Sequence, residues 1–317
     1  MPARCIVLFF LTLILALPAG GFQTPQQHAP QQPPPQEQQK PPDVITFDTN
    51  VVVLNVTVTD GLDHYVTGLT AKDFSIFEDQ ARQRIASFSF NEMPFAAVIL
   101  LDTSGSMERK MSLARAACTR FVDGIREGDV VAIYGFGGKK VTVMRDFSEV
   151  RDVGWAVFDT DPEGMTPLYD GIVKAAEALG SRSERRRAIL LVSDGADTQS
   201  RASFDEAMRR ALAADVAIYG VDLSDAALYH TGTRDNGAEV MKSFAVKSGG
   251  RFFRTPGGTQ LRDAFAQAVE ELRNQYTITY ETTNERQDGR WRTIETRVGR
   301  PSLTVRTRQG YYAAKKR

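Results

Sequence analysis

Two uninterrupted apolar runs, each followed by a short polar loop that contains an aspartate, constrain the fold of this chain most strongly. The runs are Phe95–Leu101, which precedes Asp102, and Ala188–Val192, which precedes Ser193 and Asp194. Apolar runs of this length without alternation are typical of strands that are buried on both faces. Such strands occur in parallel sheets whose two faces are covered by helices. We therefore expect an α/β core.

The rest of the middle region alternates between helical and strand-like patterns. Helices are expected at about Glu108–Arg126, from Pro167 onward, and over Ser203–Ala213, Ala238–Ser248 and Thr259–Arg273; further strands are expected over Val130–Phe136, Lys140–Phe147, Val216–Val221 and Arg251–Arg254. This alternation predicts a doubly wound, mostly parallel sheet. In such sheets, ligands bind beyond the carboxyl ends of the strands.

Both flanks of this region carry a different pattern, in which apolar and polar residues alternate. It predicts half-buried strands at Val51–Thr59, Phe74–Phe77 and Ile85–Phe90, and again around Tyr276–Tyr280, Ile294–Val298 and Leu303–Val305. Because each set is too small for a stable sheet, we expect the two sets to pair into one discontinuous β-sandwich-like domain. The alternative is that each set joins an edge of the α/β sheet separately. The expected boundaries are 44–93 and 275–312 for the β domain, 94–274 for the α/β domain and 313–317 for a tail.

The amino terminus has the layout of a secretory signal peptide. Residues 1–21 combine Arg4, an apolar run over Cys5–Leu17 and a Pro-Ala-Gly-Gly segment suited to cleavage. The run is shorter than the roughly 20 residues of a spanning helix, so we expect cleavage and no stable membrane span, with an uncleaved anchor as the alternative. Residues 22–43, rich in Gln and Pro, are expected to form a linker. The protein is therefore expected to be periplasmic or secreted.

Composition excludes several classes of protein. The 39 Lys and Arg residues balance 39 Asp and Glu residues without a long basic run, which argues against nucleic-acid binding. Only 3 His and 2 Cys are present, too few for a Cys/His zinc framework or a disulfide scaffold. After cleavage, Cys118 is the remaining thiol, and its helical spacing from apolar neighbours predicts a place in the core. The basic segment Arg182–Arg187 is expected to be a solvated loop.

Polar residues from three loops are predicted to meet at the carboxyl edge of the sheet. Asp102, Ser104 and Ser106 follow the first buried strand, Asp194 follows the second, and Thr166 precedes a helix. Two carboxylates and three hydroxyls, without His or Cys, form an all-oxygen set suited to Mg²⁺, Mn²⁺ or Ca²⁺. Each residue taken alone is better explained as a helix cap. The combination favours a metal site.

These residues also carry a specific resemblance. The segment Asp102–Ser106, Thr166 before Pro-Leu-Tyr-Asp, and Asp194 before Gly195 resemble the complete metal-ion-dependent adhesion site of von Willebrand factor type A domains. The resemblance covers about Pro94–Arg273. It implies that the two serines bind the ion directly, and that the two aspartates and the threonine bind it directly or through water.

The flanking strands extend the resemblance. Gly68-Leu69, Asp73-Phe74 and Phe77-Glu78-Asp79 are similar to the corresponding segments of bacterial secreted VWFA-related domain proteins. This wider similarity covers about Val44–Tyr312. The family binds many partners, so the resemblance implies protein binding without naming the partner.

The charge count at the predicted site gives a mechanism for binding. A divalent ion with Asp102 and Asp194 has a formal charge near zero, because hydroxyl ligands add none, and an incoming acidic group can replace a bound water. We therefore expect a non-enzymatic binding protein whose metal binds an Asp or Glu of a protein partner. The alternative is an envelope-assembly scaffold with a structural metal.

Two enzymatic readings are disfavoured. A serine hydrolase lacks support because no Gly-x-Ser-x-Gly motif surrounds Ser104 or Ser106. The available bases are His64, in the flanking strand region, and His230, in a polar loop, and both are expected to be surface residues. A phosphoryl-transfer enzyme lacks support because Ser104 stands where a second acid would be needed and no Gly-x-x-x-x-Gly-Lys loop is present.

Overall fold

A computed structural model describes residues 50–149, 151, 164–194, 197–224, 236–255 and 258–315. All of these residues belong to one compact unit, Phe47–Arg317. The expected signal peptide and linker, Gly195, His230 and the last two residues of the expected tail lie outside the described residues. None of the helices within these ranges combines the length and the apolar character needed to cross a membrane.

The α/β part is built on a mostly parallel sheet. In the described part of the chain, this sheet has six strands in the order β10-β9-β8-β5-β6-β7. They are β5 (Phe95–Asp102), β6 (Val130–Gly137), β7 (Lys140–Ser148), β8 (Arg186–Ser193), β9 (Val216–Asp222) and β10 (Phe252–Arg254). All neighbouring pairs are parallel except β6 and β7. Every residue of β5 and β6 is buried, which explains why both strands are apolar except for Asp102 at the end of β5.

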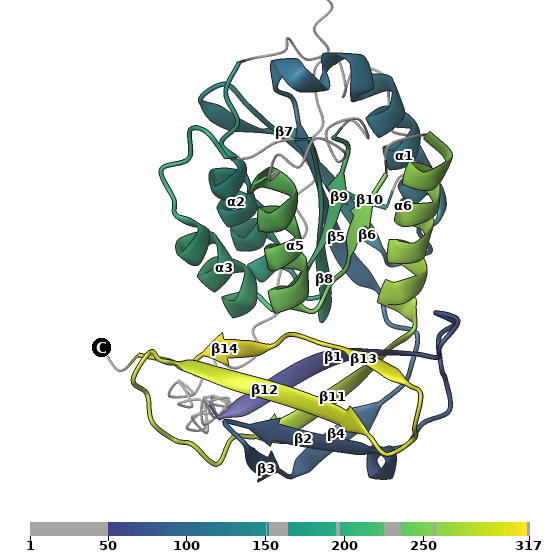
Figure 1. Ribbon diagram of the computed structural model, residues 1–317, viewed down its shortest axis with the longest axis vertical. Coiled ribbons are helices and arrows are strands. Elements are labelled where there is room, and N and C mark those ends of the chain that lie inside the picture. The colour runs from purple at the N-terminus through teal and green to yellow at the C-terminus, as the bar shows by residue number, and fades with distance from the viewer. Residues whose placement is uncertain are drawn as a thin grey trace, which may run out of the picture. The chain divides into compact units, whose positions relative to one another are not determined.

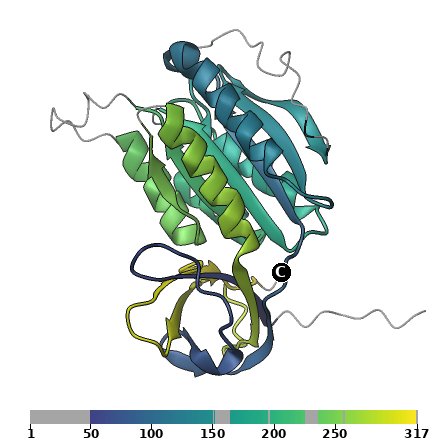
Figure 2. The same cartoon turned by 90° about the vertical axis from the view of Figure 1, so that its right-hand side faces the viewer.

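Helices cover both faces of this sheet (Figures 1 and 2). One face carries α1 (Met111–Asp123) and α6 (Gly258–Arg273), and the other carries α2 (Leu168–Gly180), α3 (Phe204–Ala213) and α5 (Asn236–Ser248). On the second face, Gly171 allows α2 to approach β5 closely, since a Cβ there would lie 3.3 Å from the side chain of Leu100. The doubly wound, mostly parallel fold predicted from the sequence is confirmed.

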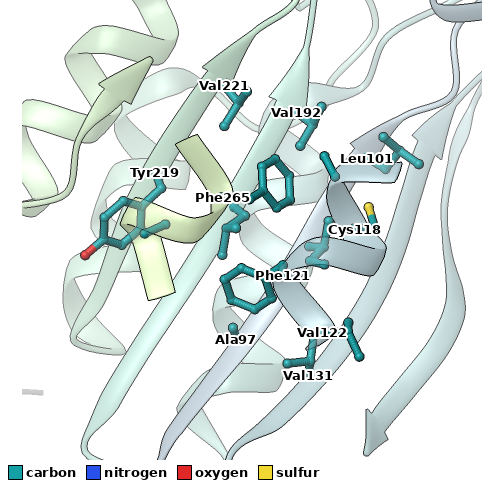
Figure 3. Close-up of a cluster of buried hydrophobic side chains, with 14 of the residues drawn as sticks. Ala97, Leu101, Cys118, Phe121, Val122, Val131, Val192, Tyr219, Val221 and Phe265 are labelled. Carbon is teal, nitrogen blue, oxygen red and sulfur yellow. The ribbon is translucent and has the colours of Figure 1, made fainter. Parts of the chain in front are cut away.

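The core between α1, α6 and the sheet is packed around aromatic side chains (Figure 3). The rings of Phe121 and Phe265 meet edge to face with centroids 6.1 Å apart. Cys118 lies in the same cluster and is fully buried, as its spacing predicted. Burial raises the pKa of the Cys118 thiol to about 12, because the apolar surroundings disfavour the thiolate.

Strands from both ends of the described chain form two further sheets. Their orders are β13-β1-β11-β4 and β14-β12-β2-β3. The strands from the amino-terminal side are β1 (Val51–Thr59), β2 (Phe74–Glu78), β3 (Ala81–Gln83) and β4 (Ile85–Ser89); those from the carboxy-terminal side are β11 (Gln275–Glu281), β12 (Trp291–Val298), β13 (Thr304–Arg306) and β14 (Gly310–Tyr312). The two sheets share one apolar cluster, whose members come from both ends of the chain.

The pairing decides between the two arrangements expected for the flanking strands. Val52 in β1 lies opposite Tyr280 in β11, and Ile76 in β2 lies opposite Thr296 in β12, with both pairs antiparallel. The two sets therefore pair with each other, as predicted. The alternative of separate additions to the α/β sheet is wrong, because β10 and β7 form the edges of that sheet in the described residues. The exact domain boundaries remain a prediction.

Four local elements differ from the expectation. The polar stretch between β2 and β4 contains the short strand β3, and β14 forms near the carboxyl terminus. The first expected helix is divided into a 3-10 segment, η2 (Gly105–Lys110), and α1, while a second 3-10 turn, η1 (Ala71–Asp73), precedes β2. Short strands of this kind depend on the strand beside them, so sequence alternation alone does not reveal them.

The prediction of a solvated Arg182–Arg187 loop is wrong at Arg186. This residue begins β8, and only 1% of it is exposed. Its guanidinium donates hydrogen bonds of 2.7 to 3.0 Å to the carbonyl oxygens of Asn91, Leu272, Arg273 and Gln275. The first carbonyl precedes β5 and the other three lie at the junction of α6 and β11. Arg186 therefore ties together the two chain segments that connect the α/β part with the β strands.

Candidate metal centre

The candidate site lies where the sheet reverses its winding. Strands β5 and β8 are neighbours, yet the chain continues from β5 to β6 on one side and from β8 to β9 on the other. Asp102 is the last residue of β5, and Asp194 directly follows β8. The register, with Leu101 beside Val192, brings both loops to adjacent positions on the carboxyl edge. This is the place where open α/β sheets bind their ligands.

Four of the five predicted residues are joined by a continuous chain of hydrogen bonds. The backbone N–H of Ser104 donates to Oδ1 of Asp102 at 2.8 Å. The Oγ atoms of Ser104 and Ser106 lie 3.0 Å apart, and Ser106 Oγ donates to Oδ1 of Asp194 at 2.7 Å. The folded chain therefore brings together the two carboxylates and two of the three hydroxyls.

Contacts on both sides hold the loop after β5 in place. The backbone N–H of Thr103 donates to the carbonyl of Phe136 in β6 at 2.9 Å. Gly137 leaves room for this contact, because a Cβ there would lie 3.1 Å from the Thr103 carbonyl oxygen. On the other side, Met107 is fully buried and its N–H donates to the carbonyl of Ser104 at 3.0 Å. The serine hydroxyls thus extend from a fixed backbone.

Thr166 lies in a third loop, two residues before α2. Its backbone N–H donates to Oγ1 of Thr198 at 2.9 Å, and the N–H of Thr198 donates back to the Thr166 carbonyl at 3.0 Å. Asp197 accepts from the N–H of Tyr169 at 3.2 Å and so acts as a turn residue at the start of α2. No hydrogen bond among the described residues joins Thr166 to the other four candidates. The role of Thr166 as a ligand, like that of the other four residues, stays a prediction.

Two further side chains belong to the site, although the sequence analysis did not include them. Ser193 Oγ donates to Oδ2 of Asp102 at 2.5 Å, so that both carboxylate oxygens of Asp102 are bonded. The ammonium of Lys110 lies 2.6 Å from Oδ2 of Asp194. Lys110 follows Ser106 by four residues in a 3-10 segment, where residues three apart share a face, so this spacing was no signal that both side chains reach Asp194.

Electrostatics favour a cation at this place. Asp102 is fully buried, and burial raises the pKa of its carboxyl group, although hydrogen bonds from Ser193 and Ser104 oppose that rise. The neighbouring carboxylate of Asp194 raises the Asp102 pKa further. Burial and the neighbouring carboxylate both disfavour the charged form of Asp102, and a positive charge placed beside it would favour that form.

The side chains present fit a hard divalent ion. The donor atoms are carboxylate and hydroxyl oxygens, which such ions prefer, and an ammonium already stands at one carboxylate. In the described ranges, no group of three or more His, Cys, Asp or Glu side chains is placed to share an ion. With two carboxylates, this site would depend on hydroxyls and waters for most of its ligands.

Comparison with known proteins identifies the type of domain around this site. Residues 97–196 match the protein-family model of the von Willebrand factor type A domain. The match supports a domain of this type in the α/β part. All five predicted site residues lie within the matched range of the von Willebrand A-type domain. A search of curated proteins found no match.

Solved structures with a similar fold include von Willebrand A domains and pilus proteins. The von Willebrand factor domain of the type V pili tip protein Mfa5 from Porphyromonas gingivalis is 13% identical, with a TM-score of 0.48, and the match covers 56% of this chain and 95% of that one. A von Willebrand factor type A protein from Catenulispora acidiphila is 12% identical, with a TM-score of 0.46 and coverages of 78% and 76%. The PilB minor pilin from Streptococcus sanguinis is 15% identical, with a TM-score of 0.45; the match covers 58% of this chain and 62% of the pilin chain.

Proposed function

We propose that this protein binds a divalent ion through Asp102, Ser104, Ser106, Thr166 and Asp194, and uses the ion to bind an acidic group of a protein partner in the periplasm or outside the cell. The observation that carries the proposal is the hydrogen-bonded chain from Asp102 through the two serines to Asp194, placed at the switch point of a von Willebrand A-type domain. Mg²⁺ is the proposed ion, with Mn²⁺ or Ca²⁺ as alternatives.

Each side chain has a separate part in this proposal. Ser104 and Ser106 present hydroxyl oxygens 3.0 Å apart from one fixed loop, a spacing that suits two ligands of one ion. Asp102, held by Ser193 and by the backbone of Ser104, contributes buried negative charge. When bound, the ion would supply a positive centre with exchangeable water positions. Ser106 is exposed, which leaves solvent access on its side of the site.

The arrangement supports binding more than catalysis. A serine nucleophile needs an adjacent base, whereas the hydroxyls of Ser104 and Ser106 contact each other and a carboxylate. His64, one of the two bases considered above, is bonded to Asp60 in the loop after β1. The proposed role is therefore that of a binding protein.

Calorimetric titration of the protein with MgCl2 and MnCl2 tests the metal site. We expect one site, and we expect Asp102→Ala to abolish it, because the substitution removes one of two charged ligands. Asp102→Asn should weaken binding strongly as well while keeping the side-chain shape, which guards against a folding artefact. Asp123→Ala, at an exposed position in α1, is the matched control and should bind as the unmodified protein does. An unchanged isotherm for Asp102→Ala would refute the site.

A second experiment tests the acidic partner and separates it from the alternative of a scaffold with a structural metal. Capture of proteins from an envelope extract should require the divalent ion and should be reversed by a chelator. Thr166→Asp should hold the metal at least as tightly, since it adds a third carboxylate, but should lose the partner because the ion is neutralised. If Thr166→Asp captures the partner as well as the unmodified protein does, the ion does not bind a carboxylate, and the scaffold becomes the better account.

A further inference from the structure

Lys110 makes a contact that the proposed metal site does not use. It is the last residue of η2 and stands directly before α1. Its Nζ lies 2.6 Å from Oδ2 of Asp194, while Ser106 Oγ donates to the other oxygen of the same carboxylate at 2.7 Å. Both oxygens of Asp194 therefore have side-chain partners within the protein.

This ion pair is shielded from solvent. The Lys110 side chain is 18% exposed and the Asp194 side chain 6%. Exposed pairs contribute little because water screens them, whereas removing one partner of a shielded pair leaves an uncompensated charge and is costly. Lys174 in α2 offers a contrast, since its exposed ammonium donates to the backbone carbonyl of Val141. Lys110, unlike Lys174, contacts the carboxylate of a candidate metal ligand.

We propose that Lys110 is a built-in competitor of the metal, which occupies Asp194 when the ion is absent and lowers the affinity of the site for divalent cations. This inference rests on the proposed function, because it concerns the same site. A divalent ion that binds beside Asp194 either displaces the ammonium from the carboxylate or is repelled by it. Both effects weaken metal binding, so Lys110 lowers the affinity for the ion whichever of them dominates.

Binding of the metal also reverses the sign of the formal charge at the site. Without the ion, two carboxylates and one ammonium have a formal charge of −1, since −2 and +1 are combined; with a divalent ion, the total becomes +1. A site of formal charge −1 repels an acidic partner and a site of +1 attracts it. Lys110 adds one positive charge with and without the ion, so the metal-bound site becomes positive, whereas the two carboxylates and the ion alone would be neutral.

The test is titration of the full protein with MnCl2 alone, because no partner is needed. Lys110→Met keeps an unbranched side chain without the charge, and we expect it to bind the metal about tenfold more tightly. Lys110→Arg keeps the charge and should stay within about threefold of the unmodified protein. Lys174→Met is the matched control and should leave the affinity unchanged. Thermal unfolding adds a second readout: Lys110→Met should lower the melting temperature in EDTA but not in saturating MnCl2.

The outcomes separate the two proposals. Tighter binding by Lys110→Met, with reduced stability only in EDTA, supports the competitor. Binding that is unchanged or weaker in Lys110→Met, while the unmodified protein binds, overturns the competitor and leaves the metal site intact. Equal loss of stability with and without the metal also overturns it, since a purely structural lysine would behave in this way. No binding by any of the proteins overturns the metal site itself.

Discussion

The buried guanidinium of Arg186 offers a sharp test of how the fold is held together. Replacement by leucine keeps an apolar stem but removes the four hydrogen bonds to the carbonyls of Asn91, Leu272, Arg273 and Gln275. These carbonyls lie on both connections between the α/β part and the β strands. The leucine variant should therefore be less stable than the unmodified protein.

The structure gives the size of the effect. A hydrogen bond from a charged donor contributes about 1.5 kcal/mol at the low end, so four such bonds contribute about 6 kcal/mol. Against this, burial lowers the pKa of Arg186 to about 10, and a fall of that size corresponds to about 3 kcal/mol of desolvation, which leucine does not incur. We expect a net loss of about 3 kcal/mol, a large part of the 5 to about 15 kcal/mol of a typical domain.

Urea unfolding followed by circular dichroism measures this loss. The matched control is Arg185→Leu, because Arg185 is the adjacent residue and is exposed; it should change the free energy of unfolding by less than about 0.5 kcal/mol. Arg186→Lys should fall between the two, since an ammonium can serve fewer of the four carbonyls. A leucine variant at position 186 as stable as the control would refute the argument that this guanidinium joins the two chain segments.

Two other predictions concern the core and a close backbone approach. The pKa of the Cys118 thiol is about 12 in the folded protein and 9.0 for the ordinary group. As the pH rises, the unfolded chain therefore loses this proton first, and stability is lost above pH 9.0. In urea unfolding, the stability advantage of the unmodified protein over Cys118→Ala should shrink by about 1.4 kcal/mol per pH unit. No change in that advantage between pH 9 and about 11 would contradict the assigned pKa. Gly250→Ala should destabilise the protein by at least about 2 kcal/mol, because the added Cβ would overlap the Ile218 carbonyl. Gly61→Ala is the control and should be nearly neutral in the same assay, because nothing lies within 4 Å of its added Cβ. Equal effects of the two substitutions would show that the backbone near Gly250 moves aside.

The sequence predicts the regular elements well where hydrophobic patterning is long. Strand β1 was predicted with its observed bounds, Val51–Thr59, because every second residue from Val52 to Val58 is apolar and polar residues stand between them from Asn55 onward. The central strands were predicted for a different reason. Their apolar runs contain few polar residues, which is typical of strands buried on both faces. By contrast, β3 has the sequence Ala-Arg-Gln and β14 the sequence Gly-Tyr-Tyr, so neither shows the alternation that predicted the equally short β13.

The candidate site also divides into residues that the sequence predicts and residues that only the structure reveals. Asp102, Ser104, Ser106 and Asp194 could be predicted as a group because each follows a recognisable strand end, and the structure joins them by hydrogen bonds. Arg186 was misjudged because a run of arginines is usually solvated, and its burial depends on four carbonyls that are distant in sequence. Lys110 was not predicted, because its contact with Asp194 joins two residues that are 84 positions apart in the sequence.

The pairing of strands from opposite ends of the chain has a consequence for the order of folding. Thr277 and Asn55, which bond across β1 and β11, are 222 residues apart. Contacts of such long range are entropically costly to form first, but an α/β part that folds early brings both chain ends together and shortens the effective loop. During synthesis, β1 must wait for β11 and β13, and β2 must wait for β12 on one edge, while its other partner, β3, follows it directly. A chain interrupted before β11 would keep these strands with unpaired edges, which favours self-association over folding.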